Sequence, residues 1–241
     1  MLCTKYRATS APAPYNLSGH SAESRYVGEM KLIGITGGIG TGKTAVAELL
    51  RQRGWVVYSS DETAREVMTR DPEVREEISR LLGPEVLTEG GLHRQRIAEL
   101  VFGDTDEHRY RLDQLDRIVH PRVLEQHMLA IERHEGEGTP IVAIDSALLF
   151  EVGLEEGFDW IIVVDAPNEA RMQRLKDRSG LTDEQVQARM REQLPMQEKR
   201  AWADFVIDNG GSLEDLRKSV EKVATIVEAF PDPEISVPGE D

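Results

Sequence analysis

The 241-residue sequence predicts an α/β fold in which helices flank a five-stranded parallel sheet. Five apolar runs of strand length alternate with helical patterns, which is typical of parallel sheets. A glycine-rich loop follows the first run, and one gap between runs is too long for an ordinary crossover and predicts a helical insertion. The five runs are residues 31–36, 55–58, 140–145, 160–165 and 205–207.

The glycine-rich loop spans residues 37–44 and reads G-G-I-G-T-G-K-T. It fits G-x-x-x-x-G-K-[ST], the phosphate-binding P-loop, and it lies between a predicted strand and a predicted helix at 43–53 as that motif requires. A dinucleotide-binding fingerprint does not fit, because Lys43 occupies the place of its last glycine. We therefore predict a P-loop NTPase fold, with Thr44 also placed to hold Mg²⁺. The predicted nucleotide-binding residues are Gly38, Ile39, Gly40, Thr41, Gly42, Lys43 and Thr44.

Composition excludes several classes of partner and site. The formal net charge of -15 argues against nucleic acid or an anionic membrane as partner, since both attract basic surfaces. No apolar run approaches the length of about 20 residues that a membrane span needs. The single cysteine, Cys3, rules out an internal disulfide, and the six histidines lack zinc-ligand spacing. We expect a cytoplasmic protein that is a monomer or a weak homo-oligomer.

The chain divides by pattern into a core, an insertion and two tails. The insertion is mostly helical and separates the second strand from the third, so we expect it to bind substrate. The N-terminal stretch lacks the apolar segment of a secretory signal, and Met30 directly before the first strand is an alternative start. The predicted boundaries are 1–29 for a disordered extension, 30–61 and 135–230 for the core, 62–134 for the insertion and 231–241 for a disordered tail.

Two local signals bear on the helices of the insertion. Asp71 and Pro72 predict a helix start, with the aspartate as N-cap and the proline in the first turn. Pro121 lies within the mostly helical stretch 93–134, and we expect it to kink or restart the helix there.

Two aspartates end predicted strands, at the edge where ligands bind in open α/β sheets. Asp61 is a candidate for the general base that accepts the proton of a substrate hydroxyl, and a helix N-cap is its alternative role. Arg65, one turn later, is a candidate for binding substrate phosphate or an ordinary surface arginine. Asp145 ends the third strand, where a Walker-B carboxylate lies near Mg²⁺.

Arginines within a predicted lid of about residues 168–195 supply candidate cations for phosphoryl transfer. Arg174 and Arg178 lie four residues apart on one helix face. Their guanidinium groups match phosphate oxygens and are placed to clamp them as a lid closes. The alternative is a solvated helix face on which these arginines pair with Asp177 or Glu169.

Other P-loop classes fit the sequence less well than a small-molecule kinase. A GTPase switch protein would carry a base-reading N-K-x-D, which the sequence lacks. A motor or helicase would need further domains and a basic surface. A nucleoside or shikimate-type kinase is the alternative enzyme, and a nucleotide-dependent binding switch is the alternative from a different class.

Short motifs outside the P-loop recur along most of the chain. They include S-D-E-T-A-R-E-V at 60–67, H-P-R at 120–122, L-L-F-E at 148–151, R-L-K-D-R at 174–178 and D-N-G at 208–210. Together with the P-loop they resemble the dephospho-coenzyme A kinase family, from Met30 to about Phe230. Two departures from the family's usual pattern are Ala147 in place of proline and Arg171 in place of glutamine.

This resemblance implies an ATP- and Mg²⁺-dependent kinase with a P-loop core, a helical substrate domain and a lid. It implies transfer of the ATP γ-phosphate to the 3′-hydroxyl of the ribose of dephospho-CoA, the last step of coenzyme A synthesis. The resemblance also implies that Lys43 is one of the catalytic residues. The resemblance assigns the base to Asp61, the lid cations to Arg174 and Arg178, the coenzyme A pocket to His120 and Arg122, and an adenine-side loop to Asn209.

Overall fold

The computed structural model describes residues 30–89, 91–103, 105–179, 190 and 193–229. The chain forms two compact units. Of the described residues, those up to 57 and from 134 onward form the first unit, called the core unit below, and those between 58 and 133 form the second, called the helical unit.

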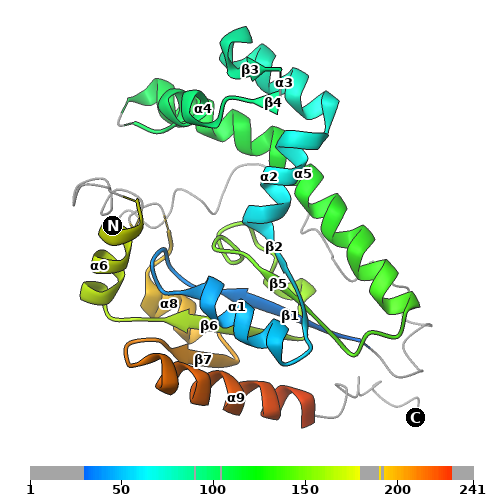
Figure 1. Cartoon of the computed structure of the whole chain (residues 1–241), viewed down its shortest axis with the longest axis vertical. Coiled ribbons are helices and arrows are strands. Elements are labelled where there is room, and N and C mark those ends of the chain that lie inside the picture. The colour runs from blue at the N-terminus through cyan, green and yellow to red at the C-terminus, as the bar shows by residue number, and fades with distance from the viewer. Residues whose placement is uncertain (1–29, 90, 104, 180–189, 191–192, 230–241) are drawn as a thin grey trace, which may run out of the picture. The chain divides into compact units, whose positions relative to one another are not determined.

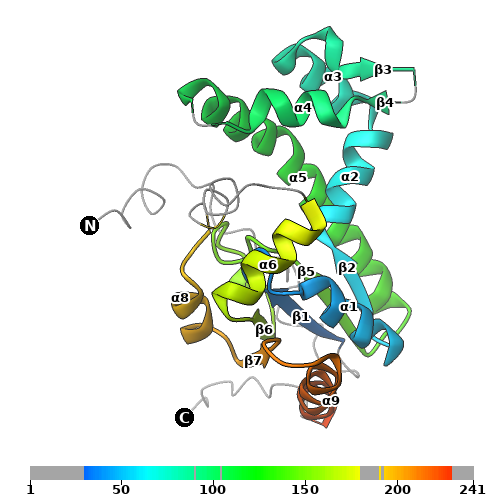
Figure 2. The same cartoon turned by 60° about the vertical axis from the view of Figure 1, so that its left-hand side comes forward.

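A five-stranded sheet organises the core unit, as the sequence predicts (Figures 1 and 2). Its order is β2-β5-β1-β6-β7, so the strand that precedes the P-loop lies in the middle. β1 pairs in parallel with both β5 and β6, and β6 pairs in parallel with β7. The strands are β1 (Lys31–Thr36), β2 (Val56–Ser59), β5 (Ile141–Asp145), β6 (Trp160–Asp165) and β7 (Phe205–Asp208).

Helices cover the sheet, which explains why its central strands are apolar without alternation. Every residue of β1 and β5 is buried. The helices of the core unit are α1 (Lys43–Gln52), α6 (Asn168–Ser179), α8 (Met196–Ala201) and α9 (Leu213–Ala229), with a 3₁₀ turn η2 at Glu155–Gly157. One hydrophobic cluster joins the sheet to α1 and α9 and includes Ile33, Ile35, Val46, Leu50, Ile162, Val164, Val220 and Val227. Each such side chain contributes about 1.5–3 kcal/mol by leaving water.

The helical unit has a core of its own. Its elements are α2 (Ser60–Arg70), α3 (Pro72–Leu82), η1 (Pro84–Val86), β3 (Leu87–Thr88), β4 (Gly91–Leu92), α4 (Arg94–Val101) and most of α5 (Asp106–Gly136). The buried members of its cluster include Val67, Val74, Ile78, Val86, Ile97, Leu115 and Val119. The predicted start of α3 is confirmed, because Oδ1 of Asp71 accepts the N–H groups of Glu73 and Val74 at 2.9 and 3.2 Å.

The structure corrects the sequence analysis at Pro121, where α5 does not restart. α5 continues through Pro121 as one helix of 31 residues. A proline inside a helix removes one N–H donor and crowds one carbonyl, but packing on the opposite face can outweigh that penalty. Here Pro121 is exposed, while Leu115, Val119 and Val123 bury the other side of the helix.

The two-stranded sheet β3–β4 is a second feature that the sequence analysis did not include. Leu87 pairs with Leu92 and Thr88 with Gly91 in antiparallel register. Each strand has only two residues, so no alternating pattern could mark them.

His127 is a buried histidine within the helical unit. Its side chain lies on α5, 3% of its surface is exposed, and Nε2 lies 3.1 Å from Oγ1 of Thr63. Tyr58 lies against the ring at a centroid distance of 6.4 Å. Burial lowers the pKa of His127 from 6.5 to about 4, because the charged imidazolium loses its hydration.

We predict that His127 makes the helical unit less stable in acid. Between pH 6.5 and pH 4 the unfolded chain binds a proton at this histidine and the folded chain does not, so the free energy of unfolding falls as pH falls. The expected loss is about 3 kcal/mol over this range. Urea unfolding at pH 7 and pH 4.5 measures it. His127→Gln should lose much less on acidification, whereas His120→Gln, an exposed change on the same helix, should behave as the wild type.

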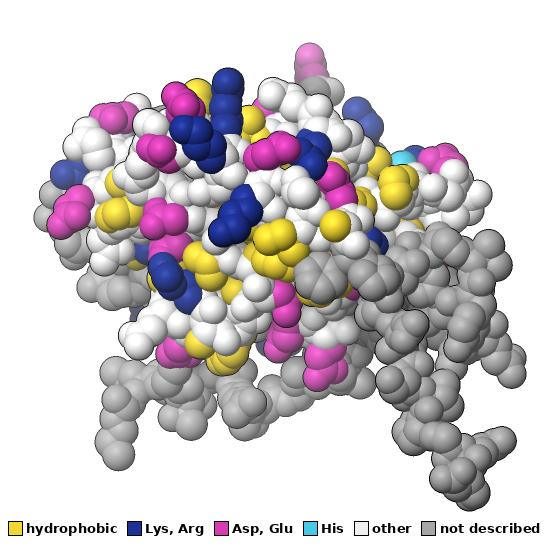
Figure 3. Space-filling view, turned by 90° about the horizontal axis from the view of Figure 1, so that it is seen from below, with side chains coloured by type: hydrophobic (Ala, Val, Ile, Leu, Met, Phe, Trp, Pro, Cys, Tyr) yellow, Lys and Arg dark blue, Asp and Glu magenta, His cyan; other side chains and the backbone are white. Residues whose placement is uncertain are grey.

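The surface carries charges of both signs. On the face seen in Figure 3, lysine and arginine side chains are interspersed with aspartate and glutamate and form no single basic patch. Among the helices in the described part of the chain, none combines the length and the apolar character that a membrane crossing requires.

Candidate active site

The P-loop connects the end of β1 to the first turn of α1. Gly42 has a positive φ of 93°, and a side chain there would collide with Nδ2 of Asn209. Gly37 is just as confined, because a Cβ atom would collide with the backbone oxygen of Val164. Only glycine fits both positions, so the spacing of these glycines is required by the loop's path.

Inside the loop, Thr41 and Lys43 bond to backbone carbonyls. Oγ1 of the fully buried Thr41 donates to the carbonyl oxygen of Gly38 at 2.8 Å. Nζ of the half-buried Lys43 donates to the carbonyl oxygen of Gly37 at 3.3 Å. Lys43 begins α1, whose N-terminal N–H groups favour an anion at the same place.

Arg174 lies against the P-loop and not on a solvated helix face. Its Nη1 donates to the carbonyl oxygens of Thr41 and Gly40 at 3.2 and 3.4 Å, and its Nη2 donates to the carbonyl oxygen of Asn209 at 2.8 Å. Asp177, its predicted alternative partner, instead accepts from Gln173 at 2.8 Å. Arg174 therefore ties α6 to the loop that follows β1 and to the loop that follows β7.

Asn209 closes the same arrangement from the end of β7. Its side chain is buried, and Nδ2 donates to the carbonyl oxygen of Thr41 at 2.7 Å. Its own N–H donates to the carbonyl oxygen of Asp165 at 2.7 Å, which fixes this loop to the end of β6. The side chain of Arg178, the other predicted lid cation, lies outside the described part of the structure.

We predict that Arg174→Met lowers kcat/KM for ATP by about 10²-fold, because the P-loop loses the guanidinium that holds its Gly40 and Thr41 carbonyls and is then misplaced relative to the nucleotide. Arg174→Lys should restore little of this loss, because one ammonium group cannot bridge three carbonyls in two directions as a guanidinium does. Steady-state kinetics with ATP varied at saturating acceptor measures both variants. Full activity of the lysine variant would contradict the bridging role.

Thr44 and Asp145, the predicted Mg²⁺ ligands, carry oxygen atoms of the kind that this ion binds. Thr44 is exposed in the first turn of α1, and Asp145 is buried at the end of β5, opposite Ile35 in the register with β1. Among the described residues, no group of three or more histidine, cysteine, aspartate or glutamate side chains is gathered to hold a metal ion. This set fits Mg²⁺, which commonly uses one or two protein ligands and completes its shell with phosphate oxygens and water.

Asp61 lies in the helical unit, in the first turn of α2 and directly after β2. The N-cap of α2 is Ser59, whose side chain accepts the N–H of Glu62, so the capping role considered for Asp61 is filled by another residue. The side chain of Asp61 is exposed. Its carboxylate is thus accessible to a substrate hydroxyl.

The candidate acceptor-side residues Arg65, His120 and Arg122 also belong to the helical unit. Arg65 is exposed on α2, and Nε2 of His120 lies 3.7 Å from a carboxylate oxygen of Asp116. Arg122 donates to Glu73 at 2.8 Å and to Glu125 at 3.4 Å. The hydrogen bond with Glu125, together with nearby carboxylates, raises the pKa of this guanidinium.

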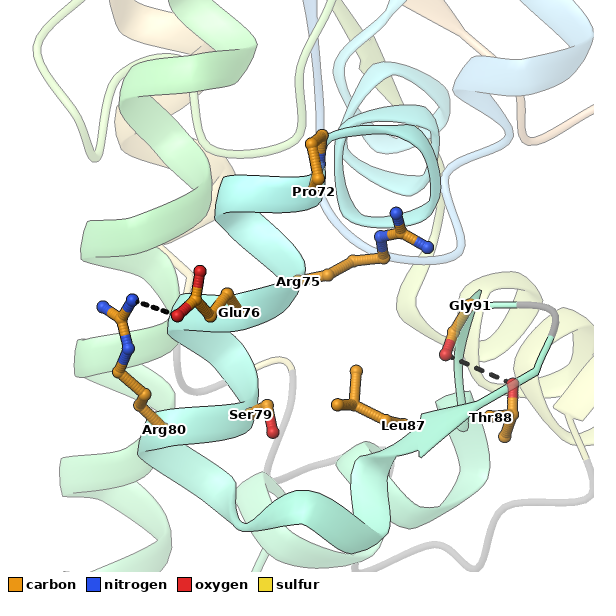
Figure 4. Close-up of a pocket in the computed structure, with 8 residues that line it drawn as sticks. All are labelled: Pro72, Arg75, Glu76, Ser79, Arg80, Leu87, Thr88 and Gly91. Carbon is orange, nitrogen blue, oxygen red and sulfur yellow. Dashed lines mark hydrogen bonds and ion pairs between the residues drawn. The ribbon is translucent and has the colours of Figure 1, made fainter.

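Arg122 also lines a hollow of about 510 Å³ within the helical unit. The other lining residues come from α2, α3 and α5 and are Thr63, Glu66, Val67, Arg70, Asp71, Pro72, Glu73 and Gln126. A second hollow of about 370 Å³ lies between α3 and the β3–β4 hairpin (Figure 4). Its lining includes Arg75, Leu87 and the ion pair of Glu76 with Arg80, whose atoms lie 2.6 Å apart.

Known proteins match the chain over most of its described length. The family model for dephospho-CoA kinase matches residues 31–215. The chain belongs to the dephospho-CoA kinase family. The dephospho-CoA kinase of Corynebacterium glutamicum is 38% identical over 195 residues, which cover 80% of this chain and 98% of that protein. That of Syntrophotalea carbinolica is 41% identical over 192 residues, covering 79% of this chain and 89% of that protein.

A solved structure from Thermus thermophilus, the protein TT1252, has a similar fold. It is 40% identical to this chain, superimposes with a TM-score of 0.68, and the match covers 84% of this chain and all of that one. As a member of the dephospho-CoA kinase family, the chain is an ATP-dependent kinase.

In this dephospho-CoA kinase family member, a buried ion pair that the sequence does not predict lies close to the P-loop. Lys199 on α8 is fully buried, and its Nζ contacts Oε1 of Glu151 at 2.7 Å and the carbonyl oxygen of Ala147 at 2.8 Å. Oε1 of Glu151 also accepts the N–H of Leu194 at 2.9 Å. Burial lowers the pKa of Lys199, Glu151 opposes this shift, and the nearby charges of Lys43 and Arg171 reinforce it.

The signal that could have identified Glu151 is its place in L-L-F-E, a motif that otherwise reads as a plain apolar turn. Lys199 offers no such signal, because M-Q-E-K-R-A reads as an exposed helical turn. Only the fold reveals that this lysine points inward and meets a carboxylate from a distant segment.

Proposed function

We propose that the protein transfers the γ-phosphate of ATP to the 3′-hydroxyl of the ribose of dephospho-CoA, giving CoA and ADP. The observation that carries this proposal is the P-loop at the end of β1, with Arg174 bonded to its carbonyls, in a chain of the dephospho-CoA kinase family. Phosphoryl transfer needs mainly positioning and positive charge, and this loop offers both.

On the nucleotide side, the P-loop N–H groups and the Lys43 ammonium bind the phosphates of ATP. Lys43 only has to turn from the carbonyl of Gly37, to which it makes a long hydrogen bond of 3.3 Å, toward an anion of higher charge. Thr44 and Asp145 hold Mg²⁺, which when bound supplies positive charge to the phosphate oxygens. Arg174 and Arg178 add charge beside the transferred group.

At the reacting centre, the Asp61 carboxylate accepts the proton of the ribose 3′-hydroxyl. The bond from this oxygen to the γ-phosphorus forms as the bond from the γ-phosphorus to the bridging oxygen of ADP breaks. The exposure of Asp61 and the capping of α2 by Ser59 leave its carboxylate available for this role.

On the acceptor side, Arg65, His120 and Arg122 bind dephospho-CoA within the helical unit. The hollow of about 510 Å³ beside Arg122 supports this assignment, since it is of the size that small-molecule sites have. Arg122 is held by Glu73 and Glu125, so an anionic part of the substrate has to compete with these two carboxylates. The arginine therefore contributes more to selectivity than to raw affinity.

The test of the proposed function is ADP release by the purified protein with ATP and Mg²⁺. Dephospho-CoA, a nucleoside and shikimate are compared as acceptors, and the product is identified by mass. We expect strong stimulation by dephospho-CoA alone, with CoA as product. Folded protein that binds ATP but shows no stimulation by dephospho-CoA would refute the substrate, and slow hydrolysis without any acceptor would indicate a nucleotide-dependent switch.

We also infer that the enzyme works in the cytoplasm, where ATP and a coenzyme precursor are available, and that it acts as a monomer or weak homo-oligomer without nucleic acid. The interspersed charges on the face in Figure 3 support the last point, since nucleic-acid binding needs a basic surface. Sedimentation of the pure protein over a range of concentrations tests its state of assembly.

A further inference from the structure

The crest of the P-loop, residues Gly38 to Gly40, is held from outside by side chains of two distant segments. Nε of Arg171 on α6 donates to the carbonyl oxygen of Ile39 at 3.0 Å. Oε1 of Gln193 accepts the N–H of Ile39 at 2.7 Å. Both polar backbone groups of Ile39 are therefore occupied by protein groups, one from each segment.

Because the peptide bond is planar, the contact of Arg171 with the Ile39 carbonyl also fixes the direction of the Gly40 N–H. In a planar trans peptide the carbonyl and the following N–H point in opposite directions. The carbonyl of Ile39 points at Arg171, so the N–H of Gly40 points away from Arg171. N–H groups that converge inside such a loop are what binds phosphate.

The same arrangement recurs two residues later. The carbonyl of Thr41 accepts from Nδ2 of Asn209 at 2.7 Å and from Nη1 of Arg174 at 3.2 Å. By the same planarity the N–H of Gly42 is directed away from Asn209 and Arg174. The carbonyls of Ile39 and Thr41 are thus held by side-chain donors, and the N–H groups of Gly40 and Gly42 point away from those donors.

The Arg171 side chain is closely packed against the crest of the P-loop. It is buried, with 4% of its surface exposed, and a side chain on Gly38 would collide with its Nη2. Nη1 donates to Oδ1 of Asn168 at 3.2 Å, which fixes the plane of the guanidinium. Burial lowers the pKa of Arg171, and Asp165 opposes this shift, as expected for a cation shielded from solvent.

We propose that Arg171 is a positioning residue that orients the Gly40 N–H toward the phosphates of bound nucleotide by holding the carbonyl of Ile39. The proposal deepens the proposed function and rests on the loop's use for ATP. The role requires an N–H donor at this point and does not require a positive charge. Gln193, which fixes the other side of the Ile39 residue, assists it.

Two neutral variants of similar length separate the donor from the charge. Arg171→Gln keeps an amide N–H that can face the carbonyl of Ile39, and Arg171→Met has none. Arg171→Lys keeps the charge, and Gln173→Met, an exposed change two residues away, is the matched control. The probe is MgADP, measured by calorimetry, with thermal unfolding of each variant measured beside it and the Gly40 amide followed by NMR.

We expect Arg171→Met to weaken MgADP binding by about tenfold or more, the effect of one hydrogen bond to a charged group. Arg171→Gln should stay within about threefold of the wild type, and its Gly40 amide resonance should still shift on binding. In turnover assays the KM for ATP should rise in Arg171→Met while the KM for dephospho-CoA stays unchanged.

Equal MgADP affinities of the glutamine and methionine variants would overturn the proposal. Wild-type MgADP affinity in Arg171→Lys together with weak affinity in Arg171→Gln would also overturn it, because the positive charge and not the N–H donor would then account for binding. The MgADP measurement does not involve dephospho-CoA. A wild-type enzyme that binds MgADP but ignores dephospho-CoA would therefore refute the proposed substrate and leave the role of Arg171 standing.

Discussion

Replacing Lys43 with methionine is expected to lower dephospho-CoA-dependent turnover about 10³-fold or more, with little change in thermal stability. Lys43 makes one long hydrogen bond, of 3.3 Å, to a carbonyl of its own loop, so its loss removes little from the fold. It removes the ammonium that neutralises charge on the transferred phosphate, which matters most in the transition state. Steady-state kinetics, with circular dichroism to verify folding, measures the effect.

The matched control for this variant is Lys222→Met. Lys222 is exposed on α9 and lies far from the P-loop in sequence, so turnover should stay at the wild-type level. If Lys43→Met raised the KM for ATP but left kcat unchanged, Lys43 would bind ground state and transition state equally, and its catalytic role would be wrong.

Replacing Asp61 with asparagine is expected to lower kcat by about 10²- to 10⁴-fold, the usual contribution of a positioned general base. Asparagine has the same shape, so both KM values should change little. The fold should be unaffected, because Asp61 is exposed and Ser59 caps α2. Turnover at saturating ATP and dephospho-CoA measures the loss.

Glu62→Gln is the control for Asp61, since it removes the neighbouring exposed carboxylate of the same helical turn. It should retain most of the activity. Near-normal turnover of Asp61→Asn would remove Asp61 from the mechanism and leave the proton to water or to the phosphate itself.

The sheet could be predicted from the sequence because parallel strands buried on both faces leave a strong signal. The runs at β1, β5 and β6 are almost wholly apolar and fall where they were expected. The strand order was not accessible in the same way, because hydrogen bonding between strands leaves no trace in their composition. The place of β1 between β5 and β6 comes from the structure.

Errors in the insertion have a physical cause. On local grounds Pro121 predicts a kink or a restart of the helix, but α5 does not restart there, because its buried side stabilises the helix on both sides of the proline. The β3–β4 hairpin is too short to show alternation. In both places long-range packing outweighs local preference, and no window of sequence contains that information.

The candidate site was predictable in its nucleotide-binding part and less so elsewhere. The P-loop motif fixes backbone conformation by residue type, so Lys43 and Thr44 could be named at once. Arg174 could be named, but its contacts with the Thr41 and Asn209 carbonyls could not. The burial of Arg171 and Lys199 could not be predicted, because a buried cation looks like a surface cation until its partner, distant in sequence, is known.

The pairing of β1 with strands far along the chain has a consequence for folding during synthesis. Lys31 pairs with Ile141, about 110 residues later, and Ile33 with Trp160, so the central strand is made long before either neighbour exists. The helical unit lies in that interval and has a hydrophobic cluster of its own. If the helical unit folds first, the flexible chain between β1 and β5 becomes shorter. Less conformational entropy is then lost when these two strands pair. The helical unit would then act during synthesis as an internal folding aid for the sheet that surrounds it in sequence.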